Sequence, residues 1–84
     1  MQTLAITYDK KFDILYARYP GSGHSYGEED PDGIITYRNI EDDSITGIAI
    51  YEARDRITHG KIELKSLPVS LEPVRGKLNS IFAG

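Results

Sequence analysis

The chain has 84 residues, no cysteine and a formal net charge of −3 at pH 7. This length allows a single domain, 1–84, and the absence of thiols excludes disulfides and thiolate metal sites. The acidic balance argues against a general phosphate-binding surface, because affinity for nucleic acids depends on clustered Lys and Arg.

The N-terminal residues MQTLAITYD lack the cationic stretch and long apolar core of a signal peptide. No apolar run reaches the roughly 18 residues that cross a bilayer. We therefore expect a cytoplasmic protein with no contact to the membrane.

Charge is unevenly distributed along the chain. Acids outnumber bases ten to four in residues 1–52, whereas bases outnumber acids six to three in residues 53–84. Two solvated faces of opposite charge are the simpler interpretation. The basic segment leaves nucleic-acid binding as an alternative, carried by Arg54, Arg56, Lys61, Lys65, Arg75 and Lys77.

Alternating apolar residues predict strands over about 3–8 and 13–19, joined by a polar turn. Segment 20–32 holds three glycines, two prolines and four acids, which favours a loop, with room for a short edge strand near 24–28. Two further strands, about 34–39 and 45–52, flank the turn 41–44 and form the clearest hairpin.

The C-terminal part predicts helical structure. Residues 53–60 favour a short helical turn that ends at Gly60, and 61–67 is expected to be extended. A helix follows, with Ser70 as its N-cap and Pro73 in its first turn. Its apolar stripe consists of Leu71, Val74, Leu78, Ile81 and Phe82.

The fold class that these elements predict is α+β. We expect an antiparallel sheet of about four strands, a meander over about 3–52. A less regular segment and a C-terminal helix, together 53–84, then pack on one face of this sheet.

Three segments resemble the family called domain of unknown function 2283, small proteins of bacteria and archaea. They are the stretch YDKKFDILYARY, the acidic loop that ends in DG and the strand GIAIYEA. The likeness covers roughly 6–54, at Tyr8, Asp9, Asp13, Leu15, Tyr16, Asp32, Gly33, Gly47, Ile48, Ile50 and Ala53. Ala49 stands where the family usually has glutamate, and Tyr51 replaces an aliphatic residue. The resemblance implies an antiparallel sheet with helical decoration and no established activity. Genes of similar proteins often neighbour small toxin-like partners, which suggests an antitoxin role.

The densest group of acids is Glu28, Glu29, Asp30 and Asp32. DPDG is similar to the start of a calcium loop, but the remaining ligand positions are missing. A solvated acidic loop is therefore expected, with docking of a basic partner as one alternative. A small metal-dependent enzyme or binding protein that uses this loop, Asp13 and His24 is the other.

No set of nucleophile, base and orienting acid stands out, so we predict no catalytic residue, no cofactor and no enzyme activity. His24 and His59 lie far apart in the sequence without ligand spacing, and no metal centre is predicted. Asp13 is expected to accept backbone hydrogen bonds at its turn.

Both faces of the predicted sheet are partly apolar. If Leu15, Ala17, Ile48 and Ile50 face the helix, then the reverse face carries Ile14, Tyr16, Ala49 and Tyr51. One helix covers only one face, and an exposed apolar patch usually marks an interface. We therefore expect a protein-interaction module that forms a homodimer, burying about 600–800 Å² per subunit, with a cognate toxin-like protein as a functional partner.

Overall fold

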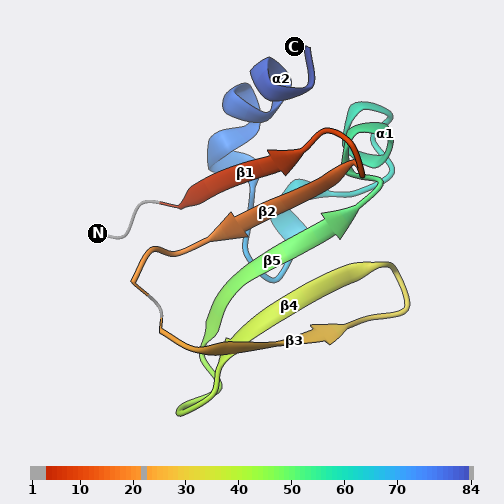
Figure 1. Ribbon diagram of the computed structural model, residues 1–84. Helices are drawn as coiled ribbons and strands as arrows, with labels where there is room; N and C mark the ends of the chain where they lie inside the picture. The colour runs from red at the N-terminus through yellow and green to blue at the C-terminus, as the bar shows by residue number, and fades with distance from the viewer. Residues whose placement is uncertain (1–3, 22, 84) are drawn as a thin grey trace.

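Five antiparallel strands form one sheet in the computed structural model, which describes residues 4–21 and 23–83. Their order is β1-β2-β5-β4-β3 (Figure 1). The strands are β1 (Ala5–Asp9), β2 (Ile14–Arg18), β3 (Ser25–Glu29), β4 (Ile34–Asn39) and β5 (Ile45–Tyr51). The expected α+β class is confirmed, with five strands in place of four.

The additional strand, β3, lies inside the predicted loop 20–32, close to the position 24–28 that leaves room for a short edge strand. It pairs with β4 from Ser25↔Asn39 to Glu29↔Ile35 and forms one edge of the sheet. Its polar, glycine-containing sequence SYGEE is mostly exposed, so it lacks the buried alternation that marks the other strands. Two of the predicted loop acids, Glu28 and Glu29, are therefore strand residues.

Two meander pieces build the sheet, the hairpin β1-β2 and the unit β3-β4-β5. They join where β2 pairs with β5, in a register that sets Ile14 opposite Tyr51, Tyr16 opposite Ala49 and Arg18 opposite Gly47. The chain that leaves β2 crosses to the far edge of the sheet before β3 begins. As a result β5, the last strand in sequence, is the central strand in space.

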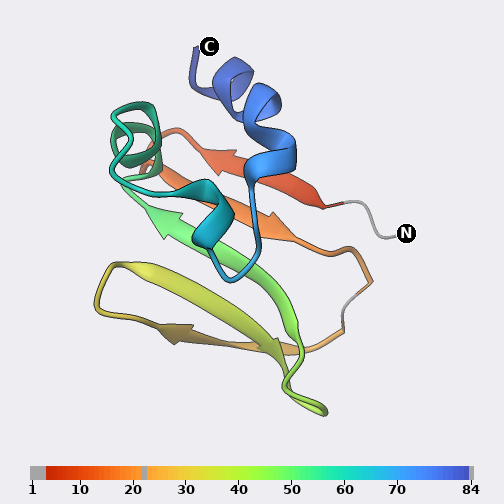
Figure 2. The same ribbon diagram turned by 180° about the vertical axis from the view of Figure 1, so that it is seen from behind.

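The segment after β5 forms a second layer on one face of the sheet. It contains α1 (Ala53–Thr58), the 3-10 turns η1 (Leu64–Ser66) and η2 (Glu72–Val74), and α2 (Arg75–Ala83). These elements lie behind the sheet in Figure 1 and in front of it in Figure 2. Each face of the sheet therefore has a different environment.

The core lies between these two layers. The sheet contributes Leu15, Ala17, Ile34, Ile48 and Ile50, and the second layer contributes Ala53, Leu64, Leu67, Val69, Leu71, Leu78 and Phe82. The predicted stripe is confirmed as a buried set, because Leu71, Leu78 and Phe82 are buried while Val74 and Ile81 pack at the margin of the core. It extends over η2 and α2, however, and not over one continuous helix.

Two local predictions in the second layer need adjustment. Segment 61–67 is not extended, because Leu64 and Leu67 both enter the core, and a spacing of three requires the tight turn η1. The Ser70 hydroxyl accepts a hydrogen bond from the Glu72 amide at 3.4 Å, at the start of η2 and not of α2. The predicted turn at 53–60 is present as α1, followed by Gly60 at φ 67°.

Candidate interaction surface

The sheet face opposite the second layer, hereafter the bare face, carries three rows of side chains. The strand pairings fix these rows, because directly paired residues point to the same side. From β1 to β3, the first row is Ala5, Arg18, Gly47, Tyr37 and Gly27, and the second is Thr7, Tyr16, Ala49, Ile35 and Glu29. The third row is Asp9, Ile14 and Tyr51. No helix of the described residues lies over these rows (Figure 1).

The four residues predicted for the reverse face lie together at the centre of the bare face. Ile14 pairs with Tyr51 and Tyr16 pairs with Ala49 on adjacent strands. Ala49 is only 1% exposed although no helix covers it, whereas Tyr51 remains 37% exposed. A small residue at the middle of the face is therefore surrounded by taller neighbours.

Ile35 and Tyr37 complete this apolar group from the β4 side, in addition to the four predicted residues. Both are half-buried and pair with Ala49 and Gly47 of β5. Alternation along IITYRN places them on the face of the strand opposite the buried Ile34. This pattern assigns them to the bare face only once the pairing of β4 with β5 is known.

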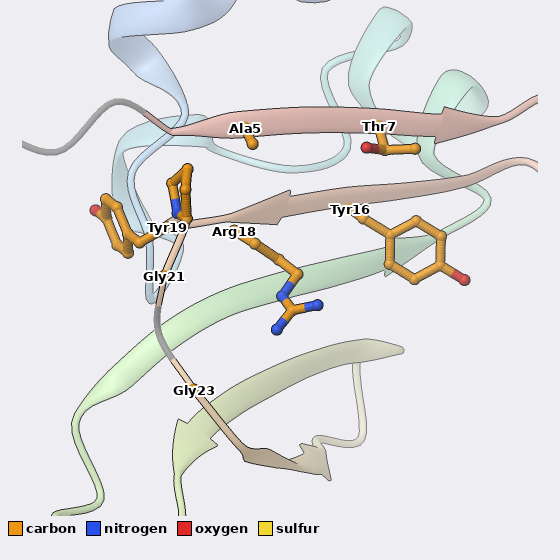
Figure 3. Close-up of a pocket in the computed structure, with 8 residues that line it drawn as sticks. Ala5, Thr7, Tyr16, Arg18, Tyr19, Gly21 and Gly23 are labelled. Atoms are coloured by element: carbon orange, nitrogen blue, oxygen red, sulfur yellow. The ribbon is translucent and has the colours of Figure 1, made fainter.

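Two glycines allow long side chains to lie across the bare face. A Cβ atom at Gly47 would lie 2.5 Å from the Ala17 carbonyl oxygen and 2.9 Å from Cγ of Arg18. A Cβ atom at Gly27 would lie 2.9 Å from Cγ2 of Ile35 and 3.1 Å from Cε1 of Tyr37. Arg18 therefore extends over β5, as Figure 3 shows.

The Tyr37 hydroxyl lies close enough to other polar groups of the face to be influenced by them. Burial raises the pKa of Tyr37, and the nearby Tyr16 and Tyr51 raise it further, while the Arg18 guanidinium lowers it. Three phenols and one cation thus share the centre of a mostly apolar surface. Such amphipathic side chains are typical of residues that contribute strongly to protein interfaces.

A shallow hollow of about 330 Å³ adjoins this group between the first two strands and the loop after β2. Figure 3 shows its lining, which consists of Ala5, Thr7, Tyr16, Arg18, Tyr19, Pro20, Gly21 and Gly23. Its volume is at the lower end of small-molecule sites. The lining thus combines the hydroxyl groups of Thr7, Tyr16 and Tyr19 with the Arg18 guanidinium and the backbone of the loop after β2.

The predicted acidic cluster does not converge on a common point. The Glu28 carboxylate pairs with Arg38 at 2.9 Å, and Oδ1 of Asp30 accepts the amides of Asp32 and Ile34 at 2.9 and 3.1 Å. Within ranges 4–21 and 23–83, no group of three or more His, Cys, Asp or Glu is placed to hold a metal ion. These acids stabilise a turn and a strand pair.

Asp13 organises the junction between the β1–β2 turn and α1. Its Oδ1 accepts hydrogen bonds from the Tyr8 hydroxyl at 2.6 Å and from the Arg54 amide at 2.8 Å. Glu52, at the N-cap position of α1, makes no capping bond with its side chain. The expected acceptance of backbone donors is confirmed, but the donor comes from α1 and not from the turn.

The histidines and the basic segment also form no joint site. His24 and His59 line separate hollows, and Nδ1 of His59 lies 2.8 Å from Asp55. Several cations of 53–83 pair with acids of the same segment, namely Arg75 with Glu72, Lys61 with Asp55 and Lys65 with Glu63. This pairing reduces the positive charge that a nucleic acid would meet.

No family model, curated protein or solved structure matched this chain in the three comparisons made. The resemblance to domain of unknown function 2283 therefore stays a prediction. None of the described helices combines the length and the apolar character needed to cross a membrane.

Proposed function

We propose that this protein is an interaction module that binds another protein chain through its bare face, with a homodimer as the simplest assembly. One observation carries the proposal. The apolar and aromatic residues Ile14, Tyr16, Ile35, Tyr37 and Tyr51 surround Ala49 on a face that the second layer leaves uncovered. Tyrosine-rich apolar patches of this kind are the usual centres of interfaces.

The size of the face supports the same proposal. Five strands spaced by about 4.8 Å, each roughly 17 Å long, give a flat area of roughly 400 Å². Protruding Tyr and Arg side chains make the accessible area larger than the flat area. Contact over the whole face therefore approaches the lower part of the range of standard interfaces, about 600–800 Å² per subunit.

The proposal is tested by Tyr16→Glu, which places a charge at the centre of the face. We expect the wild type to have about twice the chain mass of 9.4 kDa in light scattering, and the variant to have the chain mass. Ile40→Glu is the matched control, since Ile40 is 61% exposed in the β4–β5 turn, outside the bare face. A wild type that remains a monomer up to millimolar concentration contradicts the proposal.

Two finer proposals concern the natural setting. A cytoplasmic location is supported by the cysteine-free composition. An antitoxin-like role is supported by the resemblance alone. Co-expression with the product of the neighbouring gene tests that role. The wild type should restore growth, and Tyr16→Glu should not. Equal rescue by both proteins would show that the antitoxin-like role does not depend on the bare face.

A further inference from the structure

The bare face carries two charged side chains with no ion-pair partner among the described residues. Arg18 lies on β2 and Glu29 lies on β3, on opposite sides of the central strand. The third charged residue of the face, Asp9, already accepts the amides of Lys11 and Phe12 at 3.0 and 3.2 Å. Burying the face would therefore leave one cation and one anion that need partners.

Arg18 and Glu29 do not reach each other within one chain. Three strand spacings of about 4.8 Å and one row of about 7 Å put their backbones roughly 16 Å apart. A two-fold interface brings residue i of one subunit to residue j of the other, and j to i. Two such charges on either side of a central strand are thus complementary to a second copy of the same face.

The placement of the charges distinguishes two possible two-fold axes. Packed sheets keep their strands aligned within about 30°, so the axis runs nearly along or nearly across the strands. An axis across the strands lays each strand on its own copy and brings Glu29 against Glu29 of the partner subunit. An axis along β5 lays β3 over β1 of the other chain and brings Glu29 over the partner's Thr7, beside the partner's Arg18.

We infer that the partner of the bare face is a second copy of this chain, related by a two-fold axis along β5, with Arg18 of each subunit paired with Glu29 of the other. The inference rests on the proposed function and specifies its partner and register. The hollow of about 330 Å³, lined by Thr7, Tyr16 and Arg18, receives the incoming carboxylate.

The remaining residues suit this register. Tyr16 meets the partner's Ile35, and Arg18 lies against the ring of the partner's Tyr37, where a cation is attracted to the aromatic face. Ala49 lies next to its own copy at the axis. Its small side chain allows close approach of the two β5 strands, whereas a glutamate there would bring two like charges together at the centre.

Charge reversal tests the register. Arg18→Glu and Glu29→Arg each place like charges opposite one another twice per dimer, and each should raise the dimer Kd on the order of 30-fold. The double variant Arg18→Glu/Glu29→Arg restores both pairs with inverted sign, so its Kd should return to within about threefold of the wild type. Sedimentation at several concentrations measures these constants, and circular dichroism verifies that each variant is folded.

Arg38→Glu is the matched control. It breaks an Arg–Glu pair that lies within one chain at 2.9 Å, on the side of the sheet away from the bare face, and should leave the Kd unchanged. If a reversed variant does not fold, Arg18→Gln and Glu29→Gln remove the charges without repulsion and should weaken the dimer by a smaller factor.

The outcomes separate the two proposals. A dimeric wild type that Tyr16→Glu disrupts, combined with a double variant as weak as the single ones, overturns the register and leaves the proposed function standing. Single variants that dimerise like the wild type overturn the register as well. A monomeric wild type overturns both.

Discussion

At the scale of single residues, Asp13 connects parts of the chain that are distant in sequence. Its carboxylate holds the hydroxyl of Tyr8 and the amide of Arg54, while its carbonyl oxygen accepts the Ala53 amide at 3.1 Å. Tyr8 in turn packs edge-on against Phe82 of α2, with ring centroids 5.1 Å apart. Burial raises the pKa of Tyr8, and the hydrogen bond to Asp13 adds to this shift. One turn residue thereby joins both helices to the sheet.

Replacing this acceptor should destabilise the fold. Asp13→Ala removes the cap of α1 and the partner of Tyr8, and we expect the free energy of unfolding to fall by about 1–2 kcal/mol. Asp13→Asn keeps an oxygen acceptor and tolerates the φ of 55° at this position, so its loss should be clearly smaller. Urea unfolding measures both variants. Equal stability of the alanine variant and the wild type would contradict this role.

At the scale of elements, close packing of β2 against β5 depends on Gly47. A methyl group there meets the Ala17 carbonyl at 2.5 Å, and backbone cannot move without disturbing the pairing. Gly47→Ala should therefore cost about 2–3 kcal/mol. Gly27→Ala meets only the side chains of Ile35 and Tyr37 near the sheet edge, which can shift, so it should cost less. Thermal or urea unfolding ranks the two variants, and the reverse order would contradict the argument.

The elements also show how far sequence reasoning reaches. Four strands and the apolar stripe of α2 were predictable, because burial on one side leaves a period of two or about 3.6 in the sequence. β3 leaves no such period, since Ser25–Glu29 is a mostly exposed edge strand. η1 is not predictable in this way, because the buried Leu64 at its start and Leu67 just after its end fit no regular strand alternation.

The candidate surface was predictable only in part, for a related reason. Ile14, Tyr16, Ala49 and Tyr51 follow from alternation on β2 and β5 alone. The contributions of Ile35, Tyr37 and Glu29 depend on which strands are neighbours, and this information resides in the β4–β5 and β3–β4 pairings. Strand order is set by long-range packing, and local periodicity carries no information about it.

At the scale of the whole molecule, a chain this small buries only about 60% of the surface that it exposes when unfolded. The partner that we propose for the bare face would therefore add to the stability of the fold. A dimer that unfolds to two chains becomes more stable as concentration rises. A 100-fold increase in protein concentration stabilises the dimer by about 2.7 kcal/mol through mass action. Divided by the average unfolding entropy per residue, taken over both chains, this free energy should raise Tm by roughly 8 °C.

Tyr16→Glu provides the comparison for this measurement. Its Tm should be independent of concentration, because the variant unfolds as a single chain. Scanning calorimetry over the same range of concentrations measures both proteins, and a wild-type Tm that does not move would contradict a dimer that unfolds to two chains.

The position of β5 also shapes the order of events during synthesis. The two meander pieces are not joined until residues 45–51 have left the ribosome, and the layer that shelters Leu15, Ile48 and Ile50 emerges later still. Throughout that interval both sides of the nascent sheet are open to water and to chaperones. A fragment that ends near residue 52 would thus expose both faces of the sheet to solvent, the core face because the second layer is missing and the bare face as in the full chain.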